Sequence, residues 1–133
     1  MEYRTREGQV TAVDTETAIT GLYGVSTASA VQVPANVSRI VGMMVSFQTD
    51  SAANGVGTFA VKISGDGLSG VQQIICCGGV GVDGTPASNG QTGAAQQIPL
   101  DLTTVASNQI SISAFMGGSD TGTIECAVTL IFQ

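Results

Sequence analysis

The stretch that best indicates the fold reads IECAVTLIF and runs from Ile124 to Phe132. Its apolar side chains recur at every second position: Ile124, Cys126, Val128, Leu130 and Phe132. A period of two is typical of a β-strand with one face in a core. Because neither Pro nor Gly interrupts the pattern, we expect this strand to be central and buried.

The same alternation recurs upstream. It is regular at Ile110 and Ile112, at Ile98, Leu100 and Leu102, at Phe59, Val61 and Ile63, and at Val41, Met43, Val45 and Phe47 on one face of Arg39 to Thr49. It is less regular in three further segments, Gln9 to Ile19, Thr27 to Val33 and Val71 to Cys77. Together these segments predict eight antiparallel strands.

Turn-forming residues separate the predicted strands, as in Ala53-Asn54-Gly55 and Gly65-Asp66-Gly67. The stretch from Gly78 to Gln97 is rich in Gly, Ala, Ser, Asn and Gln and contains Pro86, so we expect a long loop there. The chain has almost no helical period of 3.6 residues. We therefore predict an all-β fold, an eight-stranded antiparallel jelly-roll sandwich in a single domain.

Two regions are expected along the 133 residues: a flexible N-terminal arm over residues 1–8 and one jelly-roll domain over residues 9–133. Arg4 and Arg6 lie in the arm, where they could contact a neighbouring subunit or a packaged genome. The alternative for these two arginines is a solvated, frayed end.

Composition argues against most enzyme classes. The chain contains no His, the commonest general base and metal ligand, so no conventional catalytic triad can be built. Among the acids, Asp66, Asp83 and Asp120 lie beside Gly in turns, where Asp is favoured for backbone reasons. We expect no catalytic residues, no enzyme activity and no small-molecule substrate.

No cofactor or metal site is expected either. Cys76 and Cys77 are adjacent and lack the spacing of a zinc site, so these thiols and Cys126 are expected to be reduced and buried. Calcium bound by loop oxygens near Asp66 or Asp120 remains an alternative, although no spaced series of ligands is present.

The start of the chain is charged and contains no apolar stretch typical of a secretory signal, so we expect synthesis in the cytoplasm. No apolar run approaches the roughly 20 residues of a membrane-spanning helix.

The predicted surface is poor in charge. Charged residues make up 11% of the chain, and ten acids against four basic residues give a net charge of −6. The negative charge disfavours a nucleic-acid-binding protein. Neutral polar surfaces associate with little cost of ion desolvation, so we interpret this surface as one that copies of the chain cover.

The short β-segments, the neutral Gly-rich surface and the runs Gln97 to Leu102 and Ile124 to Gln133 resemble single jelly-roll capsid proteins of icosahedral viruses, of the archaeal or thermophilic-bacterial type. The resemblance implies two four-stranded sheets, a shell of many copies and other capsid proteins, terminal arms that join neighbours, and a place in the virion. It rests on shared architecture and carries over no individual functional residue.

Two other classes of protein share a β-sandwich. One is an exported trimeric binding head or surface-fibre subunit, which normally follows a signal or stalk. The other is a carbohydrate-binding or hydrolytic module, which typically presents exposed aromatic rings. The absence of Trp and an aromatic content of 5% weaken the second alternative.

Overall fold

The computed structural model describes residues 1–11, 15–21, 30–49, 55–70, 73–82, 93–118 and 124–133. Within those residues all regular secondary structure is β. Nine strands follow one another in these segments: β1 (Glu2–Val10), β2 (Thr17–Ala18), β3 (Val31–Gln32), β4 (Arg39–Thr49), β5 (Gly55–Ser64), β6 (Gln73–Val82), β7 (Gly93–Thr103), β8 (Gln109–Gly118) and β9 (Ile124–Phe132).

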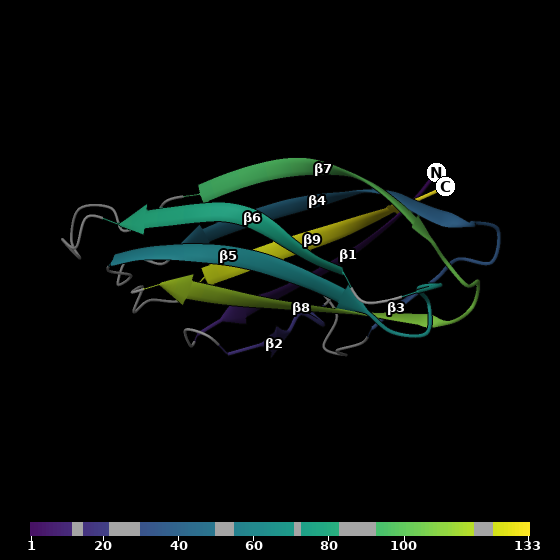
Figure 1. Ribbon diagram of the computed structural model, residues 1–133, viewed down its shortest axis with the longest axis horizontal. Helices are drawn as coiled ribbons and strands as arrows, with labels where there is room; N and C mark the ends of the chain where they lie inside the picture. The colour runs from purple at the N-terminus through teal and green to yellow at the C-terminus, as the bar shows by residue number, and fades with distance from the viewer. Residues whose placement is uncertain (12–14, 22–29, 50–54, 71–72, 83–92, 119–123) are drawn as a thin grey trace.

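The strands form two antiparallel sheets that pack face to face (Figure 1). One sheet has the order β1-β9-β4-β7 and the other the order β2-β8-β5-β6. Short strand β3 also pairs with β8, closer to the start of β8 than β2 does. Since β2 and β3 share one edge position, the sandwich has eight strand positions, four in each sheet. The predicted all-β jelly-roll sandwich is confirmed.

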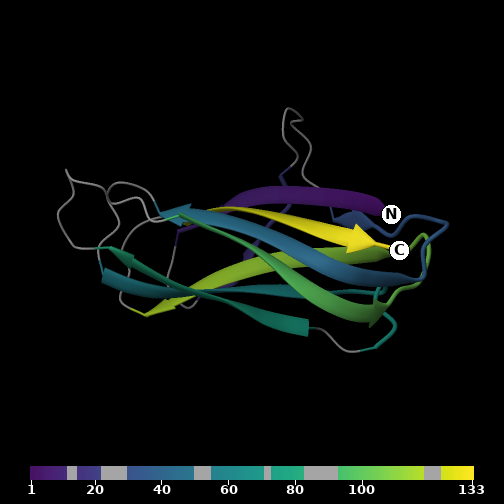
Figure 2. The same cartoon turned by 90° about the horizontal axis from the view of Figure 1, so that it is seen from above.

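The topology is that of one long hairpin rolled up on itself. Strand β5 pairs with β6, β4 with β7, β2 and β3 with β8, and β1 with β9. Rolling then brings β9 beside β4 and β8 beside β5, which completes the sheets. Figure 2 shows the two layers from above, with both chain termini at the same end. Glu2 accordingly lies opposite Phe132.

The core fills the space between the sheets. Phe47 of β4 and Phe59 of β5 stack across it, with ring centroids 4.8 Å apart. Strand β9 has a sheet neighbour on either side, and its alternating residues from Ile124 to Phe132 are buried, so the predicted central strand is confirmed. Ile131, on the opposite face, is also buried. Its side chain lies over Gly42 of β4, where a Cβ would come within 3.4 Å of it.

The N-terminal residues differ from the prediction. In place of a flexible arm over residues 1–8 and a strand from Gln9 to Ile19, β1 spans Glu2–Val10 and pairs with β9 along its whole length. Arg4 and Arg6 occupy the face of β1 that also carries buried Val10. Charged residues at inward positions conceal the strand period, which is why the sequence pattern missed this strand.

The predicted long loop from Gly78 to Gln97 is also wrong at both ends. Strand β6 continues to Val82 against β5, and β7 begins at Gly93 against β4. Ladder hydrogen bonds involve the backbone alone, so a Gly-rich stretch can pair although its composition is that of a turn. The predicted strand Val71 to Cys77 therefore shifts to β6. The predicted strand Thr27 to Val33 is seen as β3, and its first part lies outside the described residues.

A β-bulge shifts the predicted face of β4. Met43, Val45 and Phe47 are buried as expected, but the next core residue is Ile40 and not Val41. Between Ile40 and Gly42 the register against β9 advances by two residues on β4 and by one on β9. Val41 is therefore the additional residue of the bulge. Because of it, Ile40 before the bulge and Met43 after it both point into the core.

Candidate functional site

The two arginines predicted as external contacts are engaged within the subunit. Arg6 is 8% exposed and donates hydrogen bonds to the Thr5 carbonyl at 2.8 Å and to the Ala30 carbonyl at 2.9 Å. Burial, with a smaller contribution from Arg4, lowers the pKa of Arg6. Arg4 forms an ion pair with Glu2 at 2.9 Å and donates to the Tyr3 carbonyl at 3.0 Å. Arg6 is therefore largely buried, whereas the Arg4 side chain remains partly exposed, and a contact of either with a neighbour or a genome stays a prediction.

The other two basic residues are paired as well. Arg39 lies 3.1 Å from the Asp101 carboxylate, and both side chains are at least half exposed. Lys62 lies 3.2 Å from Glu16. All four basic side chains thus have an acidic or carbonyl partner inside the subunit. Each of the four positive charges therefore has a carboxylate or carbonyl oxygen close to it.

Glu16, Lys62 and Ser113 form a small polar cluster that the sequence analysis did not identify. Ser113 Oγ donates to Glu16 Oε1 at 2.7 Å, and Lys62 Nζ lies within 3.3 Å of both carboxylate oxygens. The hydrogen bond from Ser113, and secondarily that from Lys62, lowers the pKa of Glu16. A more acidic carboxyl group is a weaker base, so the cluster suits an ion pair better than proton abstraction from Ser113. Its role here is to hold the segment before β2 against β5 and β8.

No local pattern could have revealed this cluster, because Glu16 lies 46 residues from Lys62 and 97 from Ser113. Only the register of β5 against β8 reveals part of it, because this register makes Lys62 the ladder partner of Ser113.

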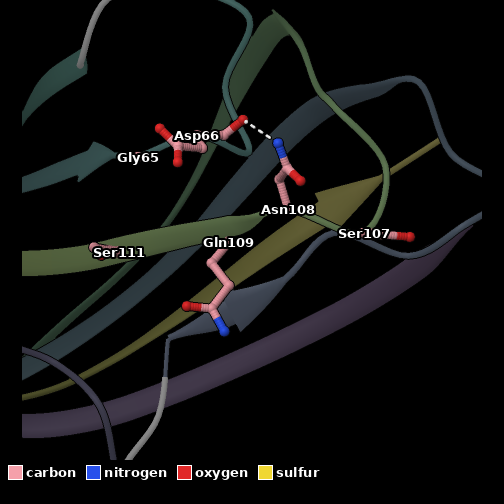
Figure 3. Close-up of a pocket in the computed structure, with 6 residues that line it drawn as sticks. All are labelled: Gly65, Asp66, Ser107, Asn108, Gln109 and Ser111. Carbon is pink, nitrogen blue, oxygen red and sulfur yellow. Dashed lines mark hydrogen bonds between the residues drawn. The ribbon is translucent and has the colours of Figure 1, made fainter.

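A polar hollow of about 520 Å³ lies at the end of the sandwich near the termini, between the β5–β6 turn and the start of β8. Its lining residues are Gly65, Asp66, Ser107, Asn108, Gln109 and Ser111. Figure 3 shows the Asn108 amide turned toward Asp66, where it donates to the backbone carbonyl at 3.2 Å, while the Asp66 carboxylate points away from Asn108. The hollow thus offers one carboxylate among neutral amides and hydroxyls, which is too few charged oxygens for a dedicated calcium site.

The predicted turn Gly65-Asp66-Gly67 contributes its first two residues to the lining of this hollow. Gly65 has φ of 114°, and a Cβ on it would lie 2.7 Å from the Gln109 carbonyl oxygen. A Cβ on Gly67 would lie 2.6 Å from Ile110 Cγ1. Both glycines are therefore required by the close approach of the turn to β8.

No cluster of three or more His, Cys, Asp or Glu residues that could bind a metal occurs among the described residues. Cys126 is a buried residue on β9. Asp120, the other predicted calcium position, and Asp83 lie outside the described residues. No helix that could cross a membrane is found in the described part of the chain.

A second hollow, of about 370 Å³, lies on the outer face of the β1-β9-β4-β7 sheet, and its lining includes Met44, Ser46, Gln97, Ala127 and Thr129. Met44 is 37% exposed, which makes it an apolar side chain presented to the outside on a strand interior to the sheet. All charged groups are absent from its lining. This surface therefore presents one apolar side chain among neutral, mostly small or polar residues.

No family model matches the sequence, and no relative was found among curated proteins. Among solved structures, dimeric latent PorU from Porphyromonas gingivalis matches with a TM-score of 0.50 and 10% identity, over 98% of this chain and 13% of that one. The Gx strain of infectious bursal disease virus matches with a TM-score of 0.40 and 15% identity, over 96% of this chain and 32% of that one.

A VP2 subviral particle of the same virus matches with a TM-score of 0.37 and 14% identity, over 97% of this chain and 33% of that one. The chain therefore spans a third or less of each of these proteins. Similarity at this level of identity concerns the fold alone.

Proposed function

We propose that the protein is a capsid subunit that assembles with copies of itself, and with other capsid proteins, into an icosahedral shell. It would be synthesised in the host cytoplasm, reside in the virion and have no catalytic activity. Jelly rolls are a common architecture of viral capsid proteins, although they also occur in lectins and other binding proteins. Because a fold alone does not define a function, the surface must carry the proposal.

The observation that carries it is the combination of internally paired basic side chains with a neutral outer sheet face. Each basic side chain has a partner inside the subunit, and the outer face of the β1-β9-β4-β7 sheet presents Met44 among neutral residues. Such a surface can be covered without desolvating unpaired cations. Shell contacts need only be weak individually, since each subunit makes several at once and the later contacts are effectively intramolecular.

The two alternatives receive less support. Sugar-binding modules stack exposed aromatic rings on their ligands, and among the described residues Tyr3 is the only aromatic side chain that is largely exposed. A trimeric binding head would also use self-association, so the size of the assembly separates it from a shell.

Sedimentation velocity and electron microscopy of the purified full chain test the proposal over a range of concentration, salt and pH. We expect closed particles or large oligomers that grow with concentration. A discrete trimer would favour the binding head. A protein that stays monomeric under all conditions would overturn the proposed function.

A further inference from the structure

The register of the β1-β9-β4-β7 sheet aligns neutral residues across its outer face. One row contains Thr5, Thr129, Met44 and Gln97, and the next contains Tyr3, Ile131, Gly42 and Pro99. All eight positions are uncharged. We call these two rows, together with the hollow beside Met44, the neutral face.

The neutral face is complementary to itself. Met44 is partly exposed, and the hollow beside it is bounded by the small side chains Ser46 and Ala127. A protrusion and a recess on the same surface suit a two-fold contact, in which each copy places its Met44 against the hollow of the other.

The free edge of β1 is unsuited to pairing with another chain. Glu7 already exchanges backbone hydrogen bonds with Gly21, at 2.9 Å in both directions, on the side of β1 away from β9. Backbone N–H and C=O groups of alternate residues in a strand point to the same side. The backbone groups of Tyr3 and Thr5 therefore also point away from β9, toward the free edge of the sheet. Their carbonyls accept hydrogen bonds from Arg4 and Arg6, which occupies the acceptors that an added strand would need.

The opposite edge, β7, is interrupted too. Pro99 cannot donate a ladder hydrogen bond, and the register against β4 is irregular immediately after it. The end of β7 is covered as well, since Ser69 N–H donates to the Thr103 carbonyl at 2.9 Å. Because neither edge of this sheet suits pairing with a strand of another chain, the outer face is the part of this sheet that remains for association.

Charge selects one orientation of a second copy. Glu7 and Glu125 lie toward one end of the sheet, while Arg39 lies at the other end of β4, on the face opposite buried Ile40. A two-fold axis parallel to the strands would place the acidic ends together. An axis perpendicular to the strands, within the plane of contact, places each acidic end against the Arg39 end of the other copy.

The position of Met44 fits this second orientation. Met44 lies five residues after Arg39 and four before Gln48, which is the ladder partner of Glu125. An axis through the Met44 row therefore places Arg39 of one copy opposite Gln48 of the other, in the row of Glu125 and one strand away from it. Each Met44 then meets the rim of the opposite hollow, which Met44 itself lines. Arg39 and Asp101 form an exposed ion pair, which is weak in water, so sharing Arg39 with a second acid costs little.

We propose that a second copy of this chain docks on the neutral face with its strands antiparallel, each Met44 at the rim of the opposite hollow and Arg39 against the row of Glu125. This inference rests on the proposed shell function and names one of its contacts. Four strands about 4.8 Å apart and about 30 Å long give roughly 600 Å² of sheet face. A standard interface buries about 800 Å² on each partner, so this contact alone is weak and suits one of several in a shell.

Sedimentation of the full chain with a charge at the centre of the face tests the contact. Met44→Glu should weaken self-association at least tenfold, because two carboxylates would meet in an apolar contact. Ser111→Glu provides the matched control, since Ser111 is exposed on the other sheet and should leave association unchanged. Thermal melting of each variant confirms that the fold is retained.

A charge exchange tests the orientation independently of the apolar contact. Arg39→Glu and Glu125→Arg should each weaken association several-fold, and the double variant should restore it. If the parent assembles and Met44→Glu assembles equally well, or if the double variant is weaker than both single variants, the proposed docking is refuted while the shell function stands. If the parent itself never self-associates, the proposed function fails.

Discussion

Replacing Leu130 by Ala should destabilise the protein strongly. Leu130 is 0% exposed and lies on β9, opposite Arg4 of β1 on one side and Met43 of β4 on the other. Because the β9 backbone is hydrogen-bonded on both sides, it cannot move into the space that the lost atoms leave. We therefore expect the upper part of the usual range for Leu→Ala, about 3 to 5 kcal/mol. That is a large fraction of the total of about 5 to 15 kcal/mol for a small domain.

Thermal unfolding followed by circular dichroism measures this loss. At about 4 °C per kcal/mol for a domain of this size, the melting temperature should fall by roughly 12 to 20 °C. Thr129→Ala is the matched control on the same strand: it removes the exposed hydroxyl contact with Thr5 at 2.8 Å and should cost about 1 kcal/mol or less. If Leu130→Ala melts within a degree or two of the parent, or if both variants lose the same amount, the assigned register of β9 is wrong.

Four further predictions follow from particular contacts. Gly67→Ala should lower the melting temperature by several degrees, because its Cβ would lie 2.6 Å from Ile110 Cγ1; an unchanged melting curve would contradict that approach. Since the pKa of Glu16 is lowered in the folded state, its contribution to stability is present above the ordinary value of 4.5 and disappears as pH falls through the lower folded value. Glu16→Gln should therefore melt below the parent at pH 7 and converge with it at strongly acid pH, whereas a constant difference would exclude the linkage. In a variant lacking Cys76 and Cys77, Cys126 should react slowly with a thiol reagent until the protein unfolds, and rapid native labelling would show that it is accessible. Deleting residues 1–8 should abolish cooperative unfolding, because β1 pairs along all of β9; a truncated chain with the parent's melting curve would make β1 dispensable.

Strands whose core face is apolar could be predicted from the sequence. The residues from Ile124 to Phe132 and around Ile110 and Phe59 alternate without interruption, and each forms a strand with the expected face inward. Strand β1 could not be predicted in this way, because Arg4 and Arg6 stand where apolar residues would mark its period. Their charges are matched by Glu2 and by backbone carbonyls, and those partners become visible only in the folded chain.

The neutral face could be predicted only in its general character. A low charged fraction already indicated a surface suited to association. The hollow beside Met44, however, is built from three strands, and Gln97 and Thr129 join it through the registers of β7 and β9 against β4. Registers between distant segments depend on loop closure and on bulges such as the one at Val41, neither of which appears as a short-range pattern.

The position of β9 between β1 and β4 has a consequence for biosynthesis. Residues at opposite ends of the sequence are ladder partners, which gives the fold a high contact order and predicts slow folding. A nascent chain on the ribosome cannot join β1 to β4 until β9 has emerged. The rows that form the neutral face exist only after that step, so chains whose β9 has not yet emerged are unable to enter an assembly through it. Emergence of β9 thus acts as a checkpoint before association.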